Sequence, residues 1–235
     1  MSAPVDPARV EALRAASASY QARADFRSVW SGLSTLDVTA RATQQRTFVD
    51  LLSPVWPTLE GKDILDFGCG AGRWLRWYLE LGATPNRLAG VDVSDGRFAE
   101  GHAINPLIQL QQIDGEHLPF PDNSFDLVTD WVVFMAVPDE AWRVRLGQEI
   151  LRVLRPGGYV FWWETLRADP RLSDNLPLDP RRYFPGLQAE VKSVRLEGKP
   201  TDALTPGKRP WLSPLIDWLA PGVTHTAARL GPKPG

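Results

Sequence analysis

Gly68, Gly70 and Gly72 follow the apolar stretch Ile64–Phe67, an arrangement typical of a strand that leads through a loop into a helix. Glycine adopts positive φ angles and has no Cβ, so a ligand can come close to the backbone. A helix beginning at 71 or 72 would direct unpaired N–H groups toward that ligand. The segment predicts a ligand-binding loop, although a tight turn would use the same glycines. Arg73 stands where a dinucleotide-binding fingerprint has its third glycine.

Three aspartates stand at the predicted carboxyl ends of strands. Asp66 could order the glycine loop or reach a cationic group. Asp92 could accept both hydroxyls of a ribose or cap a helix, for which Ser94 and Asp95 are better placed. Asp114 could accept an adenine amine or cap the turn at 116–118. Asp92 and Asp114 together favour an adenosine site.

Two further acids, Asp130 and Glu164, end the next two predicted strands and are candidate general bases. Asp130 could instead contact the cofactor or cap a turn. Trp131, Trp162 and Trp163 lie close to them in sequence, and aromatic faces suit flat rings, sugars or cationic amines. Core packing explains such residues equally well. Alternation places Trp162 and Glu164 on one face of a strand and Trp163 on the other.

The elements that must position these residues alternate between strand and helix patterns from 63 to 164. The predicted strands are 63–67, 88–93, 107–113, 125–130 and 159–164, with helices at 71–81, 96–103 and 139–154, the last capped by Asp139. Such alternation indicates a parallel sheet with helices on both faces, and ligands bind beyond the carboxyl ends of its strands.

The flanking regions complete the predicted architecture. Two helices are expected in 1–59, one after Asp6-Pro7 and one starting at Asp37, and they could form a lid or pack on the sheet. Two Pro-rich segments, 165–187 and 198–222, are expected to be irregular acceptor-site loops, the second with a short helix at 212–219. Strands are predicted at 189–196 and 223–230.

Composition narrows the classes of function. The 235 residues carry a formal charge of −2 and no basic run, which argues against nucleic-acid binding. Cys69 is the only cysteine, so no internal disulfide can form. The N-terminus has no signal-peptide pattern and no apolar run is long enough for a membrane span, so a cytoplasmic protein is expected.

Four segments, in this order and spacing, resemble the motifs of class I S-adenosylmethionine-dependent methyltransferases of the small-molecule type: Ile64–Gly72, Gly90–Ser94, Asp114–Val128 and Leu154–Gly158. The resemblance covers about residues 60–164, and the part from Asp179 to His225 resembles a bacterial branch of the family.

The resemblance implies a Rossmann-like α/β fold with a seven-stranded sheet of order 3-2-1-4-5-7-6, strand 7 antiparallel. Residues 60–235 would form the S-adenosylmethionine-binding domain, behind an N-terminal helical extension, 1–59. Asp66 and the glycine loop would hold the methionine part, Asp92 the ribose, and Asp114 the adenine. The full set of expected cofactor-binding residues is Asp66, Gly68, Cys69, Gly70, Gly72, Asp92, Val93, Asp114, Gly115, Glu116, Asp130 and Trp131.

Many small-molecule relatives have His near Met135 and Ala136, so a His base from that position is not expected here. No metal site can be assembled beyond the fourth strand. The expected activity is O-methylation of a sugar or other small molecule, with S-adenosylhomocysteine as product, by a monomer or homodimer. The alternatives are N-methylation of a small amine held by the Trp cluster and a catalytically silent S-adenosylmethionine-binding partner protein. A nicotinamide-dependent oxidoreductase is opposed by Arg73 and Asp114.

Overall fold

The computed structural model describes residues 7–22, 34–137, 139–165, 178–195 and 224–235. Its centre is a seven-stranded sheet in the order β3-β2-β1-β4-β5-β7-β6. Strand β7 runs antiparallel to both β5 and β6, whereas the pairs from β3 to β5 are parallel. The predicted fold class, strand order and antiparallel strand are therefore confirmed.

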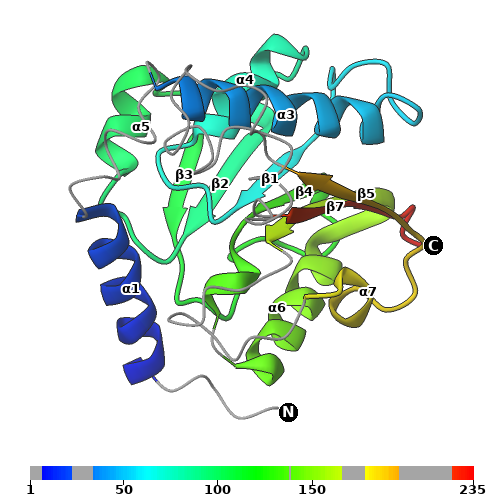
Figure 1. Ribbon diagram of the computed structural model, residues 1–235. Helices are drawn as coiled ribbons and strands as arrows, with labels where there is room; N and C mark the ends of the chain where they lie inside the picture. The colour runs from blue at the N-terminus through cyan, green and yellow to red at the C-terminus, as the bar shows by residue number, and fades with distance from the viewer. Residues whose placement is uncertain (1–6, 23–33, 138, 166–177, 196–223) are drawn as a thin grey trace, which may run out of the picture.

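The strands are β1 (Ile64–Phe67), β2 (Leu88–Asp92), β3 (Gln109–Gln112), β4 (Phe125–Trp131), β5 (Leu154–Thr165), β6 (Ala189–Arg195) and β7 (Thr224–Leu230). The helices are α1 (Pro7–Ala22), α3 (Thr35–Leu52), α4 (Arg73–Glu80), α5 (Phe98–Ile104), α6 (Glu140–Val153) and α7 (Pro180–Tyr183), with short 3₁₀ turns η1 (Pro85–Arg87) and η2 (Phe134–Ala136). Helices α3, α4 and α5 cover one face of the sheet, and α6 and α7 cover the other (Figure 1).

Each face of the sheet has its own apolar core. On the α6 face, Trp142, Leu146, Ile150 and Val153 are buried at the helical spacing that the sequence predicts. Asp139 Oδ1 accepts the N–H of Trp142 at 2.9 Å, which confirms the predicted N-cap of α6.

On the opposite face, Phe48 of α3 packs among rings from the sheet and from α4. Its ring centroid lies 4.9 Å from that of Phe161 and 5.3 Å from that of Tyr78. The carbonyl of Leu51 accepts from Arg229 at 2.9 Å. Helix α3 therefore packs directly on the sheet, which is one of the two arrangements that the sequence allows for it.

Several predicted boundaries differ from the structure, among them the starts of α3, α4 and β5. Helix α3 begins at Thr35, not Asp37, because Ser34 Oγ accepts the N–H of Asp37 as N-cap. Helix α4 begins at Arg73 because Gly72 has a φ of +67°, which no right-handed helix accommodates. Strand β5 begins already at Leu154, ahead of the predicted start at 159.

Within 165–187, which the sequence predicts to be irregular, the structure contains the single-turn helix α7. Asp179 Oδ1 caps it by accepting the N–H of Arg181 at 3.0 Å, and Pro180 occupies its first turn. The helix predicted at 212–219, and the segment 198–222 as a whole, lie outside the described residues.

Candidate functional site

The glycine loop, residues 68–72, joins β1 to α4 at the carboxyl edge of the sheet. Gly68, Gly70 and Gly72 have φ angles of +76°, +52° and +67°, as the predicted loop requires. The N–H groups of Gly68 and Cys69 both donate to the carbonyl of Val91. These bonds fix the loop against the end of β2 and bring the N-terminus of α4 to the edge where ligands bind.

Cys69 packs inward from this loop. A Cβ on Gly90 of β2 would lie 2.6 Å from the Cys69 Sγ, so the absent side chain of Gly90 provides the room. Burial raises the pKa of the Cys69 thiol, which therefore stays protonated. A ligand on the loop would meet the backbone of Cys69 and not a thiolate.

Asp92, at the end of β2, is tied directly to the glycine loop. Its Oδ2 accepts the N–H of Gly70 at 2.9 Å, and its Oδ1 accepts the N–H of Ser94 at 3.0 Å. Burial raises the pKa of this half-buried carboxyl, and the two N–H groups oppose that rise. Each carboxylate oxygen has two lone pairs, so Asp92 can accept ribose hydroxyls while it orders the loop.

Asp66 lies under the loop with only 1% of its surface exposed. Its Oδ1 accepts the hydroxyl of Thr129 at 2.8 Å, and its Oδ2 has no hydrogen-bond partner among the described residues. Burial raises the pKa of Asp66 from 3.8 to about 7. A buried acceptor without a partner fits a cationic ligand group, such as the ammonium of a methionine moiety.

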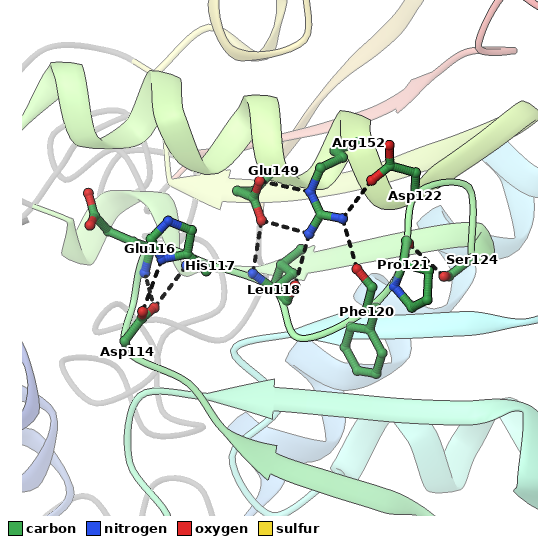
Figure 2. Close-up of polar contacts among 10 residues, drawn as sticks. All are labelled: Asp114, Glu116, His117, Leu118, Phe120, Pro121, Asp122, Ser124, Glu149 and Arg152. Atoms are coloured by element: carbon green, nitrogen blue, oxygen red, sulfur yellow. Dashed lines mark hydrogen bonds and ion pairs between the residues drawn. The ribbon is translucent and has the colours of Figure 1, made fainter. Parts of the chain in front are cut away.

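Asp114 organises the turn that follows β3. Its Oδ1 accepts the N–H groups of Glu116 and His117, both at 2.8 Å, and its Oδ2 contacts His117 Nδ1 at 3.0 Å (Figure 2). Desolvation raises the pKa of Asp114, but the bonds from His117 and Glu116 outweigh it and lower the pKa overall. The turn-capping role that the sequence allows is thus present, and 60% of the carboxyl side chain stays exposed to a ligand.

The next segment, 118–122, is held by one arginine of α6. Arg152 donates to the carbonyls of Leu118 and Phe120 and pairs with the carboxylates of Asp122 and Glu149 (Figure 2). Glu149 Oε2 also accepts the N–H of Leu118 at 3.0 Å. Sequence reasoning missed this clamp, because the arginine lies about thirty residues beyond the backbone that it binds.

Val93, Gly115 and Glu116, three further expected cofactor residues, carry supporting contacts around the same edge. The carbonyl of Val93 accepts from Arg14 Nε of α1 at 2.8 Å. The carbonyl of Gly115 accepts from Trp142 Nε1 at 2.7 Å, and Glu116 pairs with Arg145 of α6.

Helix α1 lies beside the ends of β2 and β3 (Figure 1). Besides the bond from Arg14 to Val93, its Val10 is buried and would contact a Cβ placed on Gly115 at 3.8 Å. The first predicted helix thus packs at the expected adenosine edge, and its role as a lid stays a prediction. The second, α3, packs on the sheet instead.

Asp130 and Glu164, the candidate bases, end the neighbouring strands β4 and β5 and are fully buried. Asp130 Oδ1 accepts the N–H of Val133 at 3.3 Å, and Glu164 Oε1 accepts the N–H of Phe134 at 2.6 Å. Burial raises the pKa of Glu164 from 4.5 to about 8 and raises that of Asp130 as well, to which the Glu164 charge adds. The structure brings the two acids together, away from solvent.

The three tryptophans do not form one aromatic surface. Trp162 packs on the α6 face and Trp163 on the α3 face, as alternation predicts for these two, and Trp131 also packs on the α3 face. Trp131 stacks on Trp74 with centroids 3.8 Å apart and donates Nε1 to the hydroxyl of Tyr78. All three are buried, so core packing accounts for them and no exposed amine-binding cage results.

Arg73 and Asp37 form an ion pair that sequence reasoning missed. Arg73 Nη1 contacts Asp37 Oδ1 at 2.7 Å, and Arg41 lies 3.8 Å from the second oxygen of this buried carboxylate. The pair joins the first turn of α3 to the residue that follows the glycine loop. Its only signal in the sequence is the charge of Arg73 where a fingerprint glycine is expected.

A hollow of about 410 Å³ lies at the amino ends of the strands, far along the sheet from the glycine loop. Its guanidinium groups are already engaged, since Arg87 and Arg155 both pair with Asp63 and Arg155 also pairs with Asp126. It therefore offers no unpaired charge for a ligand.

In the part of the chain that the structure describes, no group of three or more His, Cys, Asp or Glu side chains could hold a metal ion. Within the same residues, no helix combines the length and apolar character that crossing a bilayer requires.

Comparisons with known proteins agree with this geometry. The family model described as a methyltransferase domain matches residues 65–162. Demethylmenaquinone methyltransferase of Bacillus cereus is 33% identical over 110 residues, which is 45% of this chain and 45% of the relative. The chain thus spans less than half the length of the first curated relatives it matches.

Two solved structures share the fold. Phosphoethanolamine N-methyltransferase 2 of Haemonchus contortus, in complex with S-adenosyl-L-methionine, has a TM-score of 0.64 and 18% identity over 95% of this chain and 60% of that one. The 1,6-didemethyltoxoflavin-N1-methyltransferase of Burkholderia thailandensis, with bound 1,6-didemethyltoxoflavin and S-adenosylhomocysteine, has a TM-score of 0.59 and 17% identity over 99% of this chain and 93% of that one.

Proposed function

We propose that this chain is an S-adenosylmethionine-dependent methyltransferase acting on a small molecule, because residues 65–162 match the model of a methyltransferase domain and the sheet has the strand order expected of class I enzymes. The proposed acceptor atom is an oxygen of a sugar or another metabolite. The observation that carries the proposal is the unpartnered oxygen of Asp66, buried beneath a glycine loop whose backbone is tied to Asp92.

The residues present fit the cofactor. Asp66 Oδ2 would accept the ammonium of the methionine part, and the N-terminus of α4 would face its carboxylate. Asp92 would accept the ribose hydroxyls, and Asp114 would accept the exocyclic amine of adenine. When bound, S-adenosylmethionine supplies a methyl group already activated by its sulfonium. The chain therefore contributes chiefly alignment and the exclusion of water.

A base is needed only where the acceptor must lose a proton. That Asp130 or Glu164 removes this proton stays a prediction, and the burial of both acids counts against direct contact with an acceptor. The burial of the three tryptophans likewise removes the specific support for N-methylation of an amine held there. A cytoplasmic location and a monomeric or dimeric state also stay predictions.

Calorimetry of the full chain with S-adenosylhomocysteine, S-adenosylmethionine and NAD tests the proposal. We expect micromolar binding of the first two and none of NAD. If the chain binds neither S-adenosylhomocysteine nor S-adenosylmethionine, the proposed function is refuted. A screen for transfer of a labelled methyl group to sugars, phenols and amines, with and without EDTA, would then identify the acceptor class. Loss of turnover in EDTA would contradict the metal-free assignment.

A further inference from the structure

The segment that follows β4 has a strained backbone. Val132 has a φ of +66°, a left-handed conformation that is unfavourable for a β-branched residue. Its N–H donates to the carbonyl of Trp163 at 2.8 Å, so the turn is anchored to β5. Such strain persists only where the surroundings impose it.

The turn at Val132 directs the next residue onto the glycine loop. A Cβ built on Gly68 would lie 2.2 Å from Val133 Cγ2, so the Val133 side chain occupies the space beside that glycine. The segment 132–136 therefore forms one wall of the expected cofactor loop. Interactions that fix the backbone of 132–136 therefore also fix the position of Val133 against the glycine loop.

The carboxyl groups of Asp130 and Glu164 hold it. Asp130 accepts the N–H of Val133, and Glu164 accepts the N–H of Phe134. On the far side of the segment, Arg143 Nε donates to the carbonyl of Phe134 at 3.0 Å. The backbone of 133–134 is thus bound on both sides by buried side chains.

The two acids also engage each other. They lie at the ends of the paired strands β4 and β5, the charge of Glu164 raises the pKa of Asp130, and Asp130 Oδ2 and Glu164 Oε2 have no donor among the described residues. Keeping two neighbouring carboxylates charged in one buried site is costly, so we expect the pair to hold one proton between them at pH 7. That proton supplies the donor that both remaining oxygens lack.

The charged groups around the pair come from three elements. Asp66 of β1 adds negative charge, and Arg143 of α6 is paired with Glu140 at 3.2 Å. His225 of β7 stacks on Trp163 with centroids 5.2 Å apart, on the other face of the sheet. Within the described residues, none of these groups contributes a hydrogen bond to the two unsatisfied oxygens.

We propose that Asp130 and Glu164 share one proton and act as positioning residues, which hold the segment 132–136 against the glycine loop and thereby keep that loop shaped for the cofactor. They do not take a proton from the acceptor. The cofactor measurements rest on the proposed function, whereas the stability measurements do not.

The first test is the pH dependence of S-adenosylhomocysteine binding, measured by calorimetry from pH 6 to 9.5. Glu164→Gln keeps an oxygen for the Phe134 N–H and offers an N–H toward Asp130 in place of the proton. We expect its affinity at pH 7 to stay within threefold of the wild type. Above pH 8 the wild type should lose affinity at least fivefold as the second acid ionises, and Glu164→Gln should not.

Glu164→Ala removes both bonds and should lose affinity more than tenfold at pH 7, so Gln rescues what Ala loses. The proposal is overturned if Gln and Ala are equally impaired, or if Gln keeps the wild-type pH profile. If Glu164 were instead a general base, the wild type and Glu164→Gln would bind the cofactor equally well at every pH. The variant would then fail only in turnover.

The second test compares melting temperatures of Asp130→Asn, Glu164→Gln and the double variant at pH 7. Each single amide replaces the shared proton, whereas the double variant sets two NH₂ groups against each other. We expect the double variant to lose more than the sum of the singles, or to fail to fold beside two folded singles. Additive losses, or a single variant that does not fold, would overturn the proposal. A wild type that binds no cofactor would refute the proposed function and leave this second result decisive for the pair.

Discussion

Two pairs of acids stand at strand ends in this chain, and the structure treats them in opposite ways. Asp92 is the last residue of β2 and Asp114 follows β3, and both accept backbone N–H groups while part of each stays accessible. Asp130 and Glu164 lie near the carboxyl ends of β4 and β5 and are fully buried. The position of the strand in the sheet accounts for the difference between Asp114 and the buried pair: β3 is an edge strand with mostly exposed residues, whereas β4 and β5 are central and covered on both faces. An acid at a strand end therefore marks the carboxyl edge, and the position of its strand in the sheet affects how much of the acid stays exposed.

The largest expected effect tests where the two regions touch, at Gly68 and Val133. Gly68→Ala should cost about 2–4 kcal/mol of unfolding free energy, because the new Cβ overlaps Val133 and the positive φ suits only glycine. Adding Val133→Ala should restore part of this loss. Gly61→Ala is the matched control, since it also has a positive φ but no neighbour within 4 Å, and it should cost about 1 kcal/mol. Urea denaturation of the wild type, Gly68→Ala, Gly61→Ala and the Gly68→Ala/Val133→Ala double variant measures these unfolding free energies. Equal costs at Gly68 and Gly61 would show that the two regions do not press on each other.

On the accessible side alone, Asp92→Ala should weaken S-adenosylhomocysteine binding more than tenfold, about 1.4 kcal/mol. It removes the expected ribose acceptor and the bond that orders Gly70. Asp95→Ala, in the same turn, removes a carboxyl that makes no hydrogen bond to the glycine loop in the described structure and serves as the control. Unchanged affinity of Asp92→Ala in calorimetry would mean that Asp92 has been misassigned.

Asp66 shares features with both pairs, because it is buried and is also expected to bind the cofactor. The variant Asp66→Asn should separate its effect on stability from its effect on cofactor affinity. Its pKa is raised to about 7, so the stability it contributes is present below the unfolded value of 3.8 and is lost as the pH rises through 7. At pH 8 the Asn variant should therefore melt several degrees above the wild type, and at pH 5 this advantage should shrink. Cofactor affinity should fall about fivefold as the ammonium loses a charged acceptor. Melting curves at both pH values and calorimetry decide this, and a pH-independent gain would contradict it.

The smallest effect concerns the exposed Asp114–His117 pair. The hydrogen bond to Asp114 raises the pKa of His117, so its contribution is complete below the unfolded value and is lost as the pH rises through the raised one. Since the two side chains are 60% and 69% exposed, His117→Ala should cost only about 0.5 kcal/mol at pH 5.5 and almost nothing at pH 9. Urea denaturation at both values, with His102→Ala on α5 as control, measures it. A loss of about 2 kcal/mol of unfolding free energy would contradict this, because it would mean that the Asp114–His117 pair behaves like the buried acids Asp130 and Glu164.

Local patterns predicted most of what is local. The cap at Asp139, the spacing of Trp142, Leu146 and Ile150, and the positive φ angles of the glycine loop each depend on residues within a few positions of one another. Alternation also assigned Trp162 and Trp163 to opposite faces correctly. The order of the strands came from the resemblance to a family and not from any such pattern.

Interactions between distant segments could not be read in the same way. Ser34 and Asp37 are both good N-cap residues; Ser34 takes the cap, and Asp37, inside α3, pairs with Arg73 far along the chain, a contact that no local pattern predicts. The Arg152 clamp joins segments about thirty residues apart. Whether Asp130 and Glu164 meet solvent depends on the helices and loops that cover β4 and β5, which the two residues themselves do not reveal.

The ion pair between α3 and the start of α4 has a consequence for any attempt to shorten or transplant the domain. The sequence invites a cut near residue 60, ahead of the first strand. A chain that starts there would lack the ion pair between Asp37 and Arg73. It would also lack the Phe48 ring that packs against Tyr78 and Phe161. The smallest portable unit therefore begins before α3, and a glycine loop grafted without that helix would lack the ion pair that ties Arg73 to Asp37.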